Sequence, residues 1–446
     1  MNSTPNANRK HITFFGKTNS GKSSLLNAIV GQEISLVSSV KGTTTDPVTK
    51  AMELIPFGPV VFIDTAGLDD KSELGGMRIQ RSLKMLQRTD FAIYVMDIND
   101  INTNADADTG ACACTDSNTN INVDTGINTD TDTNTNTDTK VNTNTSADAA
   151  NDDYSEMAKR FKKYNIPHML VINKIDTVSQ EKVKEVAKKY KDAVFVSAGD
   201  WQSVLALKDE LIKRLSEGEE EPPIVGDLIP YNGKVILVVP VDSEAPKGRL
   251  ILPQVQVIRD CLDHGIKSYV VRDTELESAL SDIKDVDLVI TDSQAFKMVS
   301  SVVPENIKLT SFSILFARYK GDLEAFVKGV SKVKELNENS KILIAESCTH
   351  NQSHEDIGRI KIPRLLNMHV GKELCYEFKM GHDFPENIEE YDLIIHCGAC
   401  MMNKKTMQTR IDMCIEKGVS ITNYGVLLAY LTGILDRSLK IFNLNF

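Results

Sequence analysis

The fold of this chain is decided by Gly16-Lys17-Thr18-Asn19-Ser20-Gly21-Lys22-Ser23. The stretch fits the pattern G-x-x-x-x-G-K-[ST], between an apolar run at 11–15 that predicts a strand and a helical stretch at 24–30. The glycines let backbone N–H groups wrap phosphate oxygens, and the N-terminus of the following helix adds positive potential. The sequence therefore predicts an α/β nucleotide-binding domain with a phosphate-binding loop.

The residues of this loop have distinct expected roles. Lys22 neutralises the β- and γ-phosphates, and the Ser23 hydroxyl binds Mg²⁺. The other expected contacts to the nucleotide come from Gly16, Asn19, Ser20, Gly21 and Ser24.

Two more motifs follow in the order that a GTPase requires. Asp64 and Gly67 belong to Ile63-Asp64-Thr65-Ala66-Gly67, which ends an apolar strand, so Asp64 can reach Mg²⁺ through water and the Gly67 amide can face the γ-phosphate. Thr44, within Gly42-Thr43-Thr44-Thr45-Asp46, stands where the first switch is expected and completes the magnesium shell. We expect catalysis to depend on Lys22, Thr44, Asp64 and Gly67.

The base is specified by Asn173-Lys174-Ile175-Asp176, which closes another buried strand. Asp176 offers two carboxylate oxygens to the paired N–H donors on guanine, and adenine has no matching donors. Ser197-Ala198 suits a second guanine contact through backbone N–H groups. Each motif alone also fits a loop in another P-loop ATPase, but the ordered set favours GTP.

The composition bounds the rest of the chain. Its 446 residues, 41% of them hydrophobic, suffice for two or three domains. The formal charge of −11 arises mainly at 100–153, where eleven Asp accompany one Lys. This Asn-, Thr- and Asp-rich stretch cannot offset its ordering entropy by burial, so we predict that it is a disordered insert.

Several classes of function are disfavoured by what the sequence lacks. No basic stripe suited to a phosphate backbone stands out, which argues against nucleic-acid binding. No apolar run reaches the length of a membrane span, and the first ten residues do not resemble a targeting peptide. We therefore expect a cytoplasmic protein with no membrane contact.

Alternating apolar runs and helical stretches predict three α/β domains with mostly parallel sheets. The first, at 1–222, is the nucleotide-binding domain and ends at an acidic run followed by two prolines. The second spans 223–338, with strands expected at 234–240, 266–271 and 286–290. The third spans 339–446.

Soft metal ligands gather in the third domain, in Cys348-Thr349-His350 and His396-Cys397-Gly398-Ala399-Cys400. Both groups follow predicted strands, at 341–345 and 391–395, and the carboxyl ends of parallel strands are where open α/β sheets place their sites. Three thiolates suit a 4Fe-4S cluster with an open position, whereas thiolates with a histidine suit structural zinc. His350 and His396 lie near the expected ligands, and Glu355 alone would be a solvated carboxylate.

The nucleotide motifs resemble the GTPase family that includes TrmE/MnmE and Era, through Gly-Thr-Thr-Thr-Asp at 42–46 and Asp-Thr-Ala-Gly-Leu at 64–68. Leu68 replaces the glutamine that orients water in many signalling GTPases. The resemblance implies that Asn19 helps to hold a K⁺ ion in place of an arginine finger.

Outside the acidic insert, the whole chain resembles the FeFe-hydrogenase maturation GTPases of the HydF family. The shared features are Cys-x-His, a long spacer and His-Cys-x-x-Cys, together with the middle stretches 226–230 and 244–250. The resemblance implies a homodimer and a 4Fe-4S cluster on Cys348, Cys397 and Cys400. It also makes Glu355 a candidate for the exchangeable fourth ligand, beside His350 and His396.

The function implied by this resemblance is that of a scaffold that carries the binuclear iron precursor of the hydrogenase active site. Its expected partners are apo-FeFe-hydrogenase and the two radical-SAM maturases. Two alternatives stay open. A TrmE-like tRNA-modification GTPase would bind tRNA tightly at physiological salt, and a generic GTPase with structural zinc would contain zinc without sulfide.

Overall fold

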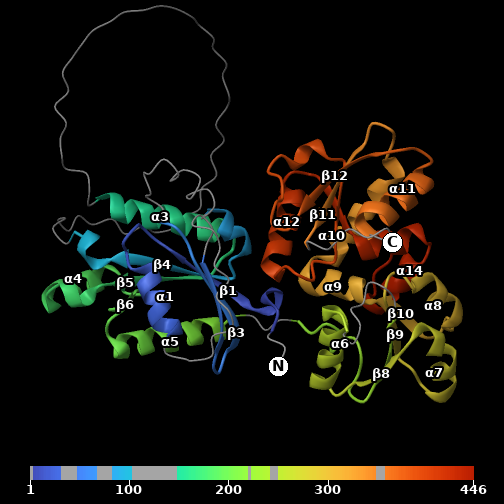
Figure 1. Cartoon of the computed structure of the whole chain (residues 1–446), viewed down its shortest axis with the longest axis horizontal. Helices are drawn as coiled ribbons and strands as arrows, with labels where there is room; N and C mark the ends of the chain where they lie inside the picture. The colour runs from blue at the N-terminus through green and yellow to red at the C-terminus, as the bar shows by residue number, and fades with distance from the viewer. Residues whose placement is uncertain are drawn as a thin grey trace, which may run out of the picture.

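The computed structural model describes residues 4–31, 48–67, 83–102, 148–218, 222–241, 250–347 and 357–446. Their strands form one six-stranded sheet and two four-stranded sheets, which confirms the expectation of three α/β domains (Figure 1). We call the elements from β1 to α5 the G domain, those from β7 to α9 the middle domain, and those from α10 to the C-terminus the third domain. Among the helices in these ranges, none has the length and apolarity needed to span a bilayer.

The G-domain sheet has the order β2-β3-β1-β4-β5-β6, and only β2 runs antiparallel to its neighbour. Its central strands are buried on both faces because they are nearly continuous apolar runs. The elements are β1 Lys10–Phe15, α1 Lys22–Val30, β2 Val48–Leu54, β3 Gly58–Asp64, η2 Met85–Arg88, β4 Phe91–Asp97, α3 Asp148–Lys163, β5 His168–Asn173, α4 Gln180–Lys189, β6 Val194–Phe195 and α5 Trp201–Ser216.

The expected insert needs one correction, because α3 begins at Asp148 and so includes the last residues of the range 100–153. The helix is anchored by Tyr154, Met157 and Phe161, which recur at helical spacing and pack into the core beside β4 and β5. Residues 103–147 lie outside the described ranges.

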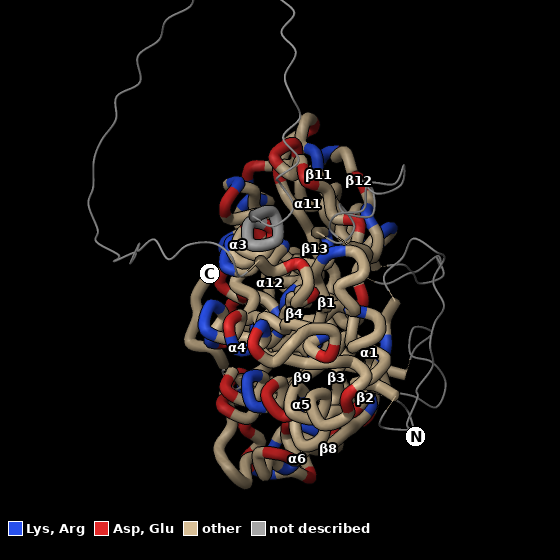
Figure 2. The backbone as a smooth tube through the Cα atoms, turned by 90° about the vertical axis from the view of Figure 1, so that its left-hand side faces the viewer, with Lys and Arg blue, Asp and Glu red and all other residues tan. Residues whose placement is uncertain are grey.

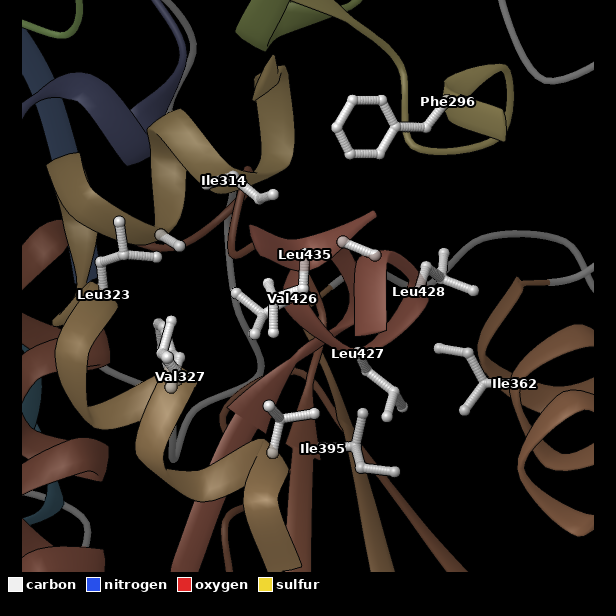
Figure 3. Packing of buried hydrophobic residues seen from close by; sticks show 14 of the residues in the cluster. Phe296, Ile314, Leu323, Val327, Ile362, Ile395, Val426, Leu427, Leu428 and Leu435 are labelled. Carbon is white, nitrogen blue, oxygen red and sulfur yellow. The ribbon is translucent and has the colours of Figure 1, made fainter. Parts of the chain in front are cut away.

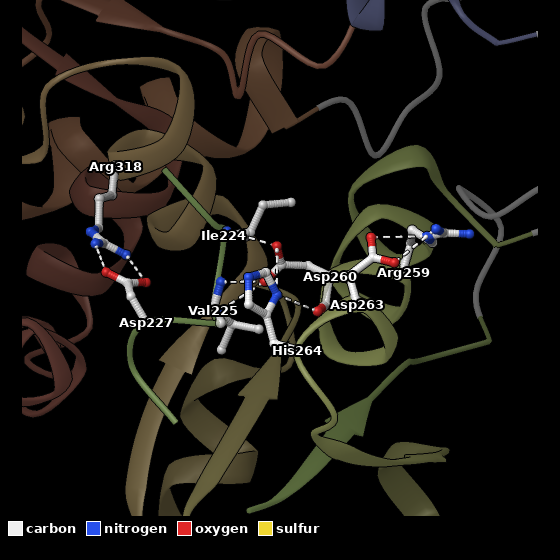
Figure 4. Close-up of polar contacts among 9 residues, drawn as sticks. Ile224, Val225, Asp227, Arg259, Asp260, Asp263, His264 and Arg318 are labelled. Atoms are coloured by element: carbon white, nitrogen blue, oxygen red, sulfur yellow. Dashed lines mark hydrogen bonds and ion pairs between the residues drawn. The ribbon is translucent and has the colours of Figure 1, made fainter. Parts of the chain in front are cut away.

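The middle domain is a parallel sheet of order β10-β9-β7-β8. Its entry segment is fixed by Asp260, whose carboxylate accepts the backbone N–H groups of Ile224, Val225 and Gly226 at 2.8–3.2 Å (Figure 4). The elements are β7 Lys234–Val238, α6 Leu252–Asp263, β8 Lys267–Val271, α7 Leu276–Asp282, β9 Leu288–Thr291, α8 Phe296–Val302, β10 Lys308–Ser311 and α9 Phe312–Lys320.

The third domain is a parallel sheet of order β12-β11-β13-β14. Helix α10 belongs to it by packing, since a Cβ on Gly329 would lie 1.8 Å from the Ile421 carbonyl oxygen of β14. The elements are α10 Leu323–Val330, β11 Lys341–Glu346, α11 Ile362–Val370, β12 Cys375–Met380, β13 Leu393–His396, α12 Lys404–Glu416, β14 Ser420–Asn423, α13 Tyr424–Leu431 and α14 Leu435–Leu439.

The middle and third domains share one hydrophobic core, whereas the G domain has its own. Phe296 and Ile314 of the middle domain belong to the same buried cluster as Ile395, Val426 and Leu435 of the third (Figure 3). Burial of this size is the main favourable term in folding, so the two C-terminal domains form one packed body.

Candidate functional site

The phosphate-binding loop requires glycine at two positions. Gly16 and Gly21 have φ values of 143° and 91°, which favour glycine, and a Cβ on Gly21 would lie 2.1 Å from Asn173 Nδ2. The Lys22 ammonium folds over the loop and donates to the carbonyl oxygens of Gly16 at 3.0 Å and Lys17 at 2.6 Å. The loop is therefore shaped to receive phosphate, with its lysine close by.

The two side chains expected to bind magnesium lie together. Ser23 Oγ donates to Asp64 Oδ2 at 2.5 Å, and Asp64 Oδ1 is a buried atom without a hydrogen-bond partner in the described part of the chain. Burial raises the pKa of Asp64, and Ser23 and Lys22 offset this only in part. An oxygen pair with one unsatisfied carboxylate atom fits a hard divalent cation such as Mg²⁺.

Asn173 joins the base-recognition motif to the phosphate-binding loop. Its Nδ2 donates to the Ser20 carbonyl oxygen at 3.0 Å, whereas Asn173 Oδ1 and Ser20 Oγ are buried and have no partner within the described residues. Lys174 adopts φ 63° and pairs with Asp97 at 2.7 Å, and Asp176 is exposed one turn beyond. This edge thus presents the polar atoms that a nucleoside would satisfy.

Ser197 and Ala198 follow β6 beside this motif, but the Ser197 amide is already engaged. It donates to Ser203 Oγ at 3.1 Å, in the first turn of α5. The Ala198 amide is therefore the remaining backbone candidate for a contact to guanine.

The other residues expected to bind the nucleotide lie on or beside the phosphate-binding loop, or outside the described part of the chain. Gly67 packs so closely on the phosphate-binding loop that a Cβ there would lie 2.1 Å from Thr18 Oγ1. Asn19 is exposed with φ 62°, and Ser24 is exposed in the first turn of α1. Thr44 and Leu68 lie outside the described residues.

Residues 397–402, which we call the cysteine loop, begin directly at the end of β13. Cys397 Sγ accepts from the backbone N–H of Ser347 at 3.0 Å and lies 2.9 Å from Ser347 Oγ. Ser347 directly follows β11 and immediately precedes Cys348. Strands β11 and β13 are parallel neighbours, so Ser347, which precedes the first half of the cysteine pattern in the sequence, lies beside the second half at the carboxyl end of the sheet.

His396 lies beside this loop, but both of its ring nitrogens are occupied. It is fully buried, with Nε2 2.7 Å from Arg410 Nη1 and Nδ1 2.9 Å from the Cys397 carbonyl oxygen. Because Arg410 can only donate, Nδ1 carries the proton. Burial and the Arg410 charge lower the pKa of His396 to about 3, so the ring is neutral. In this arrangement His396 supports the loop and offers no nitrogen to a metal.

The described surroundings of the cysteine pair leave room on one side. A Cβ on Gly398 would have no described atom within 4 Å, and Cys397 and Cys400 are both partly exposed. Two soft thiols from a tight loop, with a third cysteine next to Ser347 in the sequence, are the kind of ligands that iron–sulfur clusters and zinc both take. Cys348, His350 and Glu355 lie outside the described residues, and no group of three or more metal-binding side chains converges within the described ones.

Two polar contacts that no sequence pattern indicated connect this loop to the other domains. Asn403, 3% exposed, caps α12 and donates through Nδ2 to Arg88 O at 2.9 Å and Asp90 Oδ2 at 3.0 Å in the G domain. Lys320 of the middle domain donates to backbone carbonyls of the loop. Figures 1 and 2 show α12 on the side of the third domain that faces β1 and β4. The cysteine loop is therefore a junction of all three domains.

Family models match three consecutive parts of the chain. The 50S ribosome-binding GTPase model matches residues 11–174, the hydrogen maturase F dimerization domain matches 224–321, and the hydrogen maturase F tetramerization domain matches 324–441. The last begins at α10, in agreement with the packing of that helix on the third sheet. The cysteine loop falls within the tetramerization domain.

Curated relatives match a short part of the chain. GTPase Der of Sulfurimonas denitrificans is 42% identical over 97 residues, and the tRNA modification GTPase MnmE of Bordetella parapertussis is 38% identical over 89 residues. These matches cover 21% and 20% of this chain and 19% and 20% of the relatives, so the chain spans about a fifth of their length. A crystal structure of Aquifex aeolicus Era bound to GDP·AlF4⁻ is 17% identical, with a TM-score of 0.29, and covers 59% of this chain and 93% of its own.

Proposed function

We propose that this chain, which combines a GTPase domain with the dimerization and tetramerization domains of the hydrogen maturase F family, is an FeFe-hydrogenase maturation factor. It acts in the cytoplasm as a GTPase and as a scaffold that carries the binuclear iron precursor to apo-hydrogenase. The observation that carries this proposal is the thiol loop of Cys397 and Cys400, which lies against Ser347 at the neighbouring strand end.

GTP hydrolysis depends on groups that are already close to one another. Lys22 leaves its two loop carbonyls to neutralise the β- and γ-phosphates, and the Gly67 amide contacts the γ-phosphate. Ser23, Asp64 and Thr44 hold Mg²⁺, which supplies positive charge to the phosphate oxygens. Asn19 is the candidate K⁺ ligand, since its exposed side chain lies on the phosphate-binding loop.

Base selectivity is expected to change in a predictable direction when Asp176 is replaced by asparagine. The carboxylate accepts two N–H groups of guanine, whereas an asparagine amide can donate to the 2-carbonyl of xanthine. We expect Asp176→Asn to bind GTP at least about 100-fold more weakly, because two hydrogen bonds to a charged group are lost. Xanthosine triphosphate should bind the variant better than GTP does. Equal affinities of parent and variant for GTP, measured by calorimetry, would disprove this role of Asp176.

The third domain holds the cluster through Cys348, Cys397 and Cys400. Three protein thiolates leave one iron with an exchangeable ligand, which is the chemistry that the bound cluster supplies for attaching cargo. Glu355 and His350 are the candidates for that exchangeable position. His396 supports the cysteine loop without binding the cluster. Its Nδ1–H donates to the Cys397 carbonyl oxygen, and Arg410 donates to its Nε2.

The nucleotide state reaches the cysteine loop through Asn403. Helix η2 follows the motif at 63–67 in the chain and ends at Arg88, whose carbonyl oxygen accepts from Asn403. Asn403 stands three residues after Cys400 and begins α12. A switch movement that displaces Arg88 therefore displaces the loop.

Asn403→Asp tests this coupling without removing the helix cap. Aspartate caps a helix as well as asparagine does, but it cannot donate and it repels Asp90. In the parent we expect amide hydrogen exchange at 397–416 to differ between GDP and a non-hydrolysable GTP analogue. The variant should lose this difference while its nucleotide affinity is unchanged. Asp90→Asn added to Asn403→Asp restores one donor–acceptor pair and should recover part of the difference. If Asn403→Asp alone kept the full difference in hydrogen exchange between the two nucleotide states, coupling through Asn403 would be refuted.

Assembly into a dimer is supported by the edge of the middle sheet. Strand β8 is the last strand in its order, and its Tyr269 and Val270 are 36% and 47% exposed. Leu262, at the end of the adjacent α6, is 67% exposed. An apolar edge with no pairing strand among the described residues invites pairing with another chain, and here we propose a second copy.

The proposed function is tested by activation of apo-hydrogenase. Purified chain produced anaerobically together with the two radical-SAM maturases is mixed with apo-FeFe-hydrogenase, and hydrogen evolution is measured. We expect activity only when this chain is present, and loss of activity with Cys397→Ser. Equal activation by the maturases alone would overturn the carrier function.

A further inference from the structure

Lys320 is a buried cation that crosses from one domain into another. It ends α9 of the middle domain and is 3% exposed. Its Nζ lies 3.0 Å from the carbonyl oxygen of Met402, 3.2 Å from that of Ala399 and 3.5 Å from that of Cys400. An ammonium group carries N–H donors and no acceptor, so it can bind several backbone carbonyls of one turn at once.

The loop is shaped around this cation. Ala399 has φ 51°, a left-handed conformation that is uncommon for a residue with a side chain. The carbonyl oxygens of Ala399, Cys400 and Met402 in this turn all accept from Lys320 Nζ. Without the Lys320 ammonium, the three backbone oxygens would lose a hydrogen-bond donor in a buried setting, which costs free energy.

If the Lys320 position only had to be filled, an apolar side chain would fill it at a lower free-energy cost. Burying an ammonium group is expensive even when it is hydrogen-bonded, and a methionine of similar length would fill the same space. The charge is instead kept next to a loop that carries two thiols. Anionic thiolates or an anionic cluster on that loop would compensate the buried charge directly.

We propose that Lys320 is a positioning residue of the cluster site and sets its reduction potential. The residue fixes the turn at 399–402, which carries Cys400, and its charge lies within hydrogen-bond distance of the backbone of that turn. A reduced cluster carries one more negative charge than an oxidised one, so a fixed cation stabilises the reduced state and raises the potential. Ser347, which contacts Cys397 Sγ, acts in the same direction. This inference rests on the proposed function in assuming that the loop binds a cluster.

A consequence is that the cluster site needs two domains. Lys320 comes from the dimerization domain, whereas Cys397 and Cys400 come from the tetramerization domain. Both loading and potential should therefore depend on a residue that lies about 80 positions from the thiols in the sequence and outside their domain.

The test uses the full chain with Lys320→Met, which keeps the length and removes the charge, and with Lys320→Arg, which keeps the charge. In metal-free protein, amide hydrogen exchange at 397–403 should be faster in the methionine variant than in the parent. After anaerobic reconstitution, an EPR-monitored redox titration should give that variant a lower midpoint potential. The arginine variant should recover part of both changes.

Lys208→Met is the matched control, because Lys208 is also buried but lies in α5 of the G domain. It should leave both readouts at their parent values. Unchanged loop exchange and unchanged potential in Lys320→Met would overturn the role of Lys320. A parent that binds no iron or sulfide, but whose loop still loosens in Lys320→Met, would refute the proposed function and leave the positioning role standing.

Discussion

A chain in which Lys22 is replaced by methionine should hydrolyse GTP about 10²- to 10³-fold more slowly than the parent, the loss typical of removing one charge-stabilising donor. The methionine stem still fills the buried space, so the fold is kept. The ammonium that contacts the carbonyl oxygens of Gly16 and Lys17 is lost, and with it the cation that neutralises the β- and γ-phosphates. Phosphate release under saturating GTP and Mg²⁺ measures the effect.

Lys17→Met is the control for this prediction. Lys17 belongs to the same loop, but it is partly exposed and pairs with Asp153 at 2.9 Å on the surface. Such surface pairs contribute about 0.2–1 kcal/mol, so hydrolysis should stay within a few-fold of the parent. Hydrolysis by Lys22→Met at the rate of Lys17→Met would show that Lys22 has no special role.

Replacing Cys397 by serine should abolish binding of the iron–sulfur cluster while GTP hydrolysis continues at the parent rate. The hydroxyl oxygen is a poor substitute for a soft thiolate, although its size preserves the contacts with Ser347. The hydrolytic groups lie in another domain, with their own core. Iron and sulfide analysis after anaerobic reconstitution, with phosphate release on the same sample, measures both effects.

Cys375→Ser separates this loss from a general effect of removing a thiol. Cys375 is exposed at the start of β12, whose place at the end of the sheet order puts it away from β13. Its replacement should leave iron and sulfide at parent amounts. A Cys397→Ser chain that retains the full cluster would exclude Cys397 as a ligand.

The parts of the fold that could be predicted from the sequence are those with continuous apolar runs. The strand expected at 11–15 is found as β1, and the apolar runs at 91–96 and 168–172 likewise form β4 and β5, because burial on both faces demands such runs. Strand β12 was not expected, since its Lys and Glu residues leave it only half buried. Strand β2 has a similar mixed pattern at the other sheet edge.

The site residues that could be predicted are those that belong to short sequence motifs with a known chemical role. Ser23 and Asp64 meet although they are 41 positions apart, because strand order brings β3 beside β1. Asn403 could have been found as a helix cap, but its partner at Arg88 could not. Lys320 leaves no pattern at all, since a side chain that binds backbone carbonyls places no constraint on its partners' identities.

The central claim is that Cys348, Cys397 and Cys400 hold a 4Fe-4S cluster in a GTPase. The most direct test is iron, sulfide and zinc analysis of the full chain after anaerobic purification and reconstitution, with EPR of the reduced sample. We predict about four iron and four sulfide per chain and the signal of a reduced 4Fe-4S cluster. One zinc per chain without sulfide would contradict the account.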